Sequence, residues 1–171
     1  MGLRIWNGLI LGAMAMMWVA SGAQREKPVL SAAASGHVPG LEAELARGPQ
    51  DSRAVRDLAQ AYLEAKAPGF AQRTVEAAPA SVRADAEVEH VYARALLEQG
   101  RAADALAAER DVLATCANDG CETRLVVLAT RRAAILEELV RLGVEDAAAY
   151  PEVTQIAYQN ATRQARLARI D

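Results

Sequence analysis

The sequence has few of the residues that build β-sheets. Aromatic residues make up 4% of the 171 positions, with a single Phe, and runs that combine Val, Ile, Thr and aromatics are almost absent. Alanine supplies much of the 52% hydrophobic content, and alanine has the highest helix propensity. The composition therefore predicts an all-α protein, and the length fits one domain.

The signatures of common enzyme sites are also missing. The sequence contains no glycine-rich phosphate loop, no nucleophile elbow and no paired-histidine zinc motif. Glu87 and His90 have the three-residue spacing of di-iron helix bundles, but such a site needs a second pair, and the chain has two His in all. We therefore expect His90 to be a surface residue or one with a structural partner. We expect no enzyme activity, no cofactor and no metal; an enzyme with an unrecognised site is the less favoured alternative.

Neither sign of charge dominates. The formal net charge is -3, and it becomes -4 once Arg4 in the N-terminal segment is left out. Such a balance excludes a general attraction to nucleic acid or to anionic membranes. Arg131 and Arg132 interrupt the longest apolar helix pattern. The favoured interpretation of this pair is a solvated face, and a site for an acidic partner is the alternative.

The one long hydrophobic run lies at the N-terminus. Arg4 precedes residues 5–20, whose only polar member is Asn7, and Ser21-Gly22-Ala23 supplies the small residues that a signal peptidase recognises. Residues 1–23 are therefore predicted to be a signal peptide cleaved after Ala23. Because the run is close to the lower limit of about 17 residues for crossing a bilayer, an uncleaved anchor is the alternative. We expect a periplasmic or secreted protein, or one anchored in the inner membrane by residues 5–20.

Both cysteines are consistent with export. Cys116 and Cys121 flank Ala-Asn-Asp-Gly, a turn sequence, and an oxidising compartment allows them to form a disulfide. Two free thiols, or a metal or redox site, are the alternatives. The last has little support, because no further His or Cys is near in sequence and redox pairs usually have two intervening residues rather than four.

Helical patterns cover most of the chain after a linker. Residues 24–40 contain Pro28, Pro39 and Gly36 without apolar periodicity, which predicts a linker before a helical domain at 41–171. Helices are expected at 41–47, 51–67, 70–78, 81–99, 101–115, 122–142 and 151–170. Asp51 or Ser52 is expected to cap the second helix and Ser81 the fourth. Asn160 and Gln164 make the apolar stripe of the last helix mixed, so this helix is expected to pack loosely or to meet a partner.

Two helix pairs repeat at a distance of 34 residues. The matched positions are Leu58/Tyr92, Ala59/Ala93, Ala61/Ala95, Tyr62/Leu96, Leu63/Leu97, Glu64/Glu98, Ala71/Ala105 and Ala78/Val112. With this period, residues 52–115 resemble the tetratricopeptide repeat family, most clearly at Tyr92-Ala93, Leu96-Leu97, Gly100-Arg101 and Ala105-Leu106. The chain departs from the family at Pro68-Gly69, in the first turn, and at Leu139, where a third unit would need a small residue. Ala59 and Ala93 are expected at close helix crossings, and Ala103 on an outer side.

The resemblance implies a short solenoid of antiparallel helix pairs, closed by the two C-terminal helices. A plain alanine-rich bundle with a coincidental period is the alternative. The resemblance also implies a non-enzymatic protein-binding or scaffold module outside the cytoplasm, in a bacterial envelope complex, with a protein or peptide partner. A membrane-anchored structural bundle subunit is the alternative. Nucleic acid is not expected as a partner. Contact with a membrane is expected only through residues 5–20, if these residues are not cleaved off. The implied contact residues lie on the first helix of each pair: Arg56, Gln60, Glu64, Glu87, Arg94 and Glu98.

Overall fold

The computed structural model describes residues 37–48 and 50–167, and the regular structure within them is entirely α-helical. The all-α prediction is therefore confirmed. The helices are α3 (Val38–Arg47), α4 (Ser52–Glu64), α5 (Pro68–Glu76), α6 (Ala80–Arg83), α7 (Ala86–Leu97), α8 (Ala102–Asp119), α9 (Thr123–Arg141) and α10 (Pro151–Leu167). The apolar run at 5–20 lies outside the described residues, and none of the helices they form is long and apolar enough to cross a membrane.

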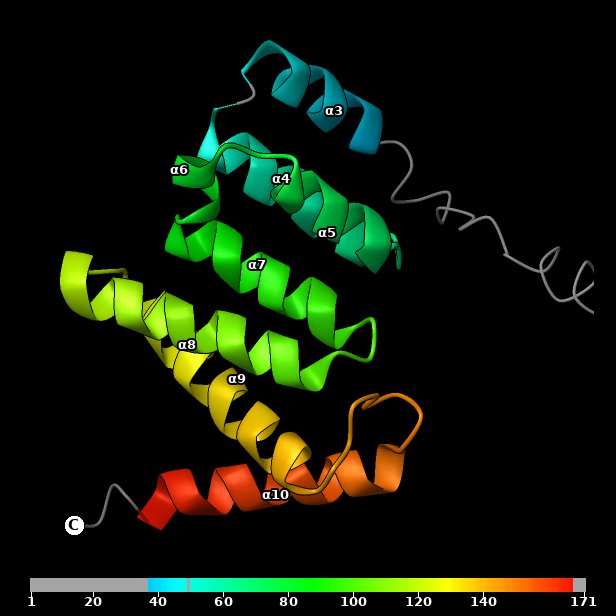
Figure 1. Ribbon diagram of the computed structural model, residues 1–171, viewed down its shortest axis with the longest axis vertical. Coiled ribbons are helices and arrows are strands. Elements are labelled where there is room, and N and C mark those ends of the chain that lie inside the picture. Colours follow the sequence, from blue (N-terminus) through cyan, green and yellow to red (C-terminus); the bar gives the residue numbers. More distant parts are fainter. Residues whose placement is uncertain (1–36, 49, 168–171) are drawn as a thin grey trace, which may run out of the picture.

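The helices stack in chain order, with α3 at one end and α10 at the other (Figure 1). Helix α4 packs on α5, and α7 packs on α8. Helix α7 also contacts both α4 and α5, so the second pair lies directly on the first. Helix α9 then covers α8, α10 crosses α9, and α3 covers α4.

Small residues lie where the helices approach one another. Ala59 and Ala93 have no exposed surface, and the same is true of Ala71 and Ala105. Ala103 is exposed, as expected. Burial of alanine at matched positions lets the backbones come close, while larger side chains such as Leu63 and Leu96 fill the core beside them.

The turn between α4 and α5 differs from the prediction. Helix α4 ends at Glu64 rather than near residue 67, because Lys66 adopts a left-handed conformation with φ of 59°. The amide of Ala67 then donates to the carbonyl of Tyr62 at 2.9 Å, which closes the helix end in a Schellman-type turn. Pro68 does not act as a breaker; it begins α5, where its missing N–H has no cost.

Two of the predicted N-terminal boundaries are also corrected. Ser81 lies inside the short helix α6, and α7 is instead capped by Asp85, whose carboxylate accepts from the amide of Glu87 at 2.9 Å. Asp51 caps α4 in the same way, as predicted. Helix α3 begins at Val38, within the expected linker, because the Val38 side chain is buried against the core of α4 and α5.

The cysteines form a disulfide, as predicted, but the loop around them is shorter than expected. Helix α8 continues through Ala117, Asn118 and Asp119, so Cys116 lies in its last turn. Gly120, with φ of 75°, ends the helix. The bond to Cys121 has an S–S distance of 2.09 Å and joins the end of α8 to the start of α9.

Candidate functional site

The six predicted contact residues lie on α4 and α7, which are neighbours in the stack, with Glu98 as the residue that caps the end of α7. Arg56 on α4 donates to Asp57, at 2.7 Å, and across the helix boundary to Glu87 on α7. Arg56 and Glu87 therefore connect α4 to α7, a contact that the sequence did not predict. We call the set Arg56, Gln60, Glu64, Glu87, Arg94 and Glu98 the α4–α7 strip.

The other members of the α4–α7 strip pair within their own helix. Gln60 donates to Glu64 at 3.0 Å, and Arg94 donates to Glu98 at 2.9 Å, both at the i, i+4 spacing. Exposed pairs of this kind typically contribute less than about 1 kcal/mol. These pairs therefore hold their side chains only weakly.

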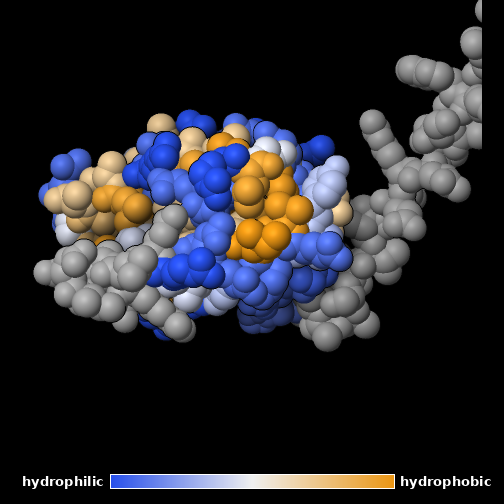
Figure 2. Space-filling view, turned by 90° about the horizontal axis from the view of Figure 1, so that it is seen from below, coloured by the Kyte–Doolittle hydropathy of each residue, from blue (hydrophilic) through white to orange (hydrophobic). Residues whose placement is uncertain are grey.

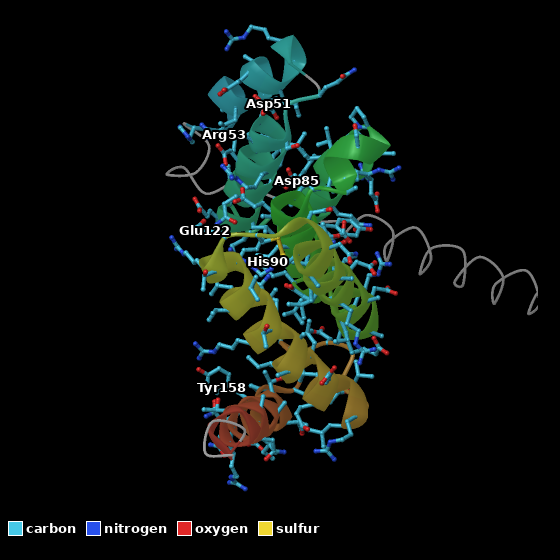
Figure 3. The ribbon with its side chains drawn as sticks, turned by 90° about the vertical axis from the view of Figure 1, so that its left-hand side faces the viewer. Asp51, Arg53, Asp85, His90, Glu122 and Tyr158 are labelled. Atoms are coloured by element: carbon cyan, nitrogen blue, oxygen red, sulfur yellow. A yellow bond between two sulfur atoms is a disulfide. The ribbon has the colours of Figure 1, made fainter. Side chains whose placement is uncertain are left out.

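A buried ionic cluster lies between α7, α8 and α9. Glu109 on α8 is completely buried, and its two carboxylate oxygens contact Arg132 Nη1 of α9 at 2.8 Å and His90 Nδ1 of α7 at 2.9 Å. Arg132 also donates to the backbone carbonyl of His90 at 3.1 Å. Because every member is satisfied, the cluster fixes three helices at one point. Figure 3 shows His90 near the middle of the stack, below the capping residue Asp85.

This cluster changes two sequence interpretations. His90 does have a structural partner, as expected, but Arg132 is not part of a solvated face. Glu87 is bound to Arg56 instead of lying with His90, so the spacing of Glu87 and His90 does not bring the two together. Sequence reasoning missed Glu109, although its position between Ala105 and Val112 on the buried side of α8 was a signal.

Arg131 points the other way from Arg132. Its guanidinium lies over the ring of Tyr158 on α10, with 5.3 Å from Cζ to the ring centroid, and it donates to the Tyr158 hydroxyl. Tyr158 lies at the lower end of the stack in Figure 3. The neighbouring Asn160 donates to buried Glu138 at 3.1 Å, which accounts for one polar residue in the mixed stripe of α10. The side chain of Gln164 lies outside the described residues.

Exposed large apolar side chains are concentrated on α9, α10 and their connection. They are Val127, Leu128, Val140, Leu142, Tyr150, Ile156 and Tyr158, and Phe70 lies apart from them on α5. Figure 2, seen from the α10 end, shows an apolar patch bordered by polar side chains on this face. Such patches often mark contact surfaces.

Two hollows flank α5. An apolar groove of about 340 Å³ runs between α3, α4 and α5, past Leu45, Leu58 and Ala78. At its edge Tyr62 donates to Glu42, and burial, followed by this hydrogen bond, raises the pKa of Tyr62 to about 12. The second hollow, of about 330 Å³, lies against α5, α6 and α7 and includes Glu89. Burial, then the negative charges of Asp111 and Glu109, raises the pKa of Glu89 to about 6.

Comparisons of the chain with protein-family models, with curated proteins and with solved structures gave no match. The resemblance to tetratricopeptide repeats thus has only the chain's own period and helix packing as support. The α4–α7 strip remains a prediction, now with a defined position and internal pairing.

Proposed function

We propose that this chain is a non-enzymatic, tetratricopeptide-like protein-binding module that acts outside the cytoplasm in a bacterial envelope complex. The observation that carries the proposal is the position of α4 and α7. They are the first helices of two units 34 residues apart, they lie side by side, and they carry the α4–α7 strip, whose charged groups are held only by weak, partly exposed pairs.

The packing supports a stack of repeats over a plain bundle. Helix α7 contacts both helices of the preceding pair, which is how each repeat in a solenoid contacts its neighbour. Ala59 and Ala93 are fully buried at matched positions in the two units. The α7–α8 turn contains Gly100, with φ of 74°, where an added Cβ would lie 3.0 Å from Asp146 Cβ. Any other residue at position 100 would therefore be strained by the positive φ and would require the loop before α10 to shift.

Export is supported by two independent features. Residues 1–23 have the order of a secretory signal: a positive charge, an apolar run and small residues. The Cys116–Cys121 disulfide belongs to a class of bonds that persists in oxidising compartments.

A site-specific photo-crosslinking amino acid tests the binding surface. Placed at Gln60 or Arg94 in the full chain, in the native bacterium, it should give a discrete adduct with another protein. Placed at Ala103, which is exposed on α8, it should give none. Equal adducts at all three positions, or none at Gln60 and Arg94, would contradict a partner site on α4 and α7.

A further inference from the structure

Arg131 on the long helix α9 contacts Tyr158 of α10. Its guanidinium is fixed by the ring and hydroxyl of Tyr158. A guanidinium has five N–H donors in a planar fork, so the contact with Tyr158 leaves most of them unused. No carboxylate of the described residues lies within ion-pair distance of Arg131, whereas Arg56, Arg94 and Arg132 each hold one.

Tyr158 adds a second donor at the same place. Its hydroxyl oxygen accepts from Arg131, which leaves its own O–H proton to donate. The O–H group and the free edge of the guanidinium can therefore contact the two oxygens of one carboxylate. Bidentate, charge-assisted hydrogen bonds of this kind are the geometry that Arg favours.

Leu128 supplies an apolar contact beside these donors. It lies three residues before Arg131, so the two side chains share one face of α9, and 43% of Leu128 is exposed. It also stands 34 residues after Arg94, which stands 34 after Gln60. The 34-residue spacing therefore relates Leu128 to two members of the α4–α7 strip in sequence only, since α9 is continuous where a third unit would turn.

We propose that Leu128, Arg131 and Tyr158 form a docking site for an acidic protein segment. A carboxylate of the segment binds the Arg131 guanidinium and the Tyr158 hydroxyl, and a neighbouring aliphatic side chain packs on Leu128. The proposal rests on the proposed binding function and names the chemistry of the partner. Stacking on Tyr158 orders Arg131 before the partner arrives, which lowers the entropy lost on binding.

The distribution of charge favours such a partner at this end. Helices α9 and α10 together contain six Arg and three Glu, a net charge of +3, whereas the other described residues contain nine basic and 17 acidic residues, a net charge of -8. An acidic segment is therefore repelled by most of the molecule and attracted towards the α9 and α10 end.

Selection from a phage-displayed library of random twelve-residue peptides tests this site. The full chain is the bait, and recovered peptides are measured by fluorescence anisotropy against the wild type and against Arg131→Gln, Tyr158→Phe and Arg163→Gln. Arg163 is exposed on α10 and serves as the matched control.

We expect recovered peptides to contain Asp or Glu next to an aliphatic residue. We expect Arg131→Gln to weaken binding about tenfold, the loss of one charge-assisted hydrogen-bonded contact, with a smaller loss for Tyr158→Phe and none for Arg163→Gln.

A change in the peptide tests whether its carboxylate contacts Arg131 itself or is attracted only by the charge of the whole surface. Changing the acidic residue of a recovered peptide to its amide should weaken binding to the wild type more than binding to Arg131→Gln, since that variant keeps only the contact with the Tyr158 hydroxyl. Peptides without acidic residues, or peptides that bind Arg131→Gln as tightly as the wild type, would overturn the docking site and leave the proposed binding function intact. Failure to recover any peptide above background would also overturn the docking site, whereas the proposed binding function is contradicted by the cross-linking result.

Discussion

At the scale of single residues, two glutamates that interact with each other have opposite environments. Glu109 is completely buried between a guanidinium and an imidazole. Glu89 lies on α7, the partner helix of α8, and its pKa is raised to about 6, mainly by burial and then by the negative charges of Asp111 and Glu109. The first carboxylate is stabilised by its surroundings, and the second is destabilised once it is ionised.

The same substitution at these two positions should change stability in opposite directions. At pH 7.5, Glu109→Gln should lower the free energy of unfolding by about 3 kcal/mol, because Arg132 is left partly buried without its counter-charge. Glu89→Gln should raise it by up to about 1 kcal/mol, a figure reduced for solvent screening. Urea unfolding of both variants measures the difference, and a shift of the same sign in both would contradict this account.

The effect of Glu89 should depend on pH in a defined direction. Since its pKa is raised above the ordinary value of 4.5, the folded protein binds more protons than the unfolded chain between about pH 4.5 and 6. Protonated Glu89 therefore favours the folded state fully below about pH 4.5, and this contribution is lost as the pH rises through about 6. The gain from Glu89→Gln should therefore disappear in unfolding measurements at pH 4.

At the scale of helices, the sequence predicted which elements form better than where they end. Apolar periodicity identified α4, α7, α8, α9 and α10, because each buries one stripe. The ends depend on single local interactions that periodicity does not contain: the left-handed Lys66 shortens α4, and Asp85 replaces Ser81 as a cap. Likewise, Asn118 and Asp119 are typical of turns, yet they continue α8 until Gly120.

The helix crossings give the prediction that belongs to this scale. Ala59→Leu and Ala93→Leu should each lower stability by about 1–3 kcal/mol, because the added methylenes enter contacts that leave no exposed surface on either alanine. Ala103→Leu should change it by no more than about 0.5 kcal/mol, since Ala103 is exposed. Helix propensity is nearly matched across the three changes. Thermal melts that show equal stability for all three would remove the main support for a repeat.

At the scale of the whole molecule, the parts of the candidate site that span helices were the least predictable. The i, i+4 pairs Gln60–Glu64 and Arg94–Glu98 follow from helical spacing alone. The pairing of Arg56 with Glu87 depends on how α7 lies across α4, and the His90–Glu109–Arg132 cluster depends on three helices at once. For the same reason, adjacent Arg131 and Arg132 looked equivalent in the sequence, although one faces Tyr158 and the other the interior.

The compartment proposed for the protein can be tested on the whole chain through its disulfide. The full chain and a version lacking residues 1–23 are produced in the same bacterium, trapped with an alkylating reagent without reductant, and weighed by mass spectrometry. If residues 1–23 direct export, the full chain should carry no alkyl group, because Cys116 and Cys121 are bonded. The version without them should carry two, because cytosolic thiols are kept reduced.

Two alkyl groups on the full chain would contradict export. No alkyl group on either version would show that the bond forms without export, and would separate the disulfide from the compartment. This control is informative because only four residues separate the two cysteines. Closing so short a ring stabilises the fold by no more than about 2 kcal/mol, so the reduced chain should still fold and remain measurable.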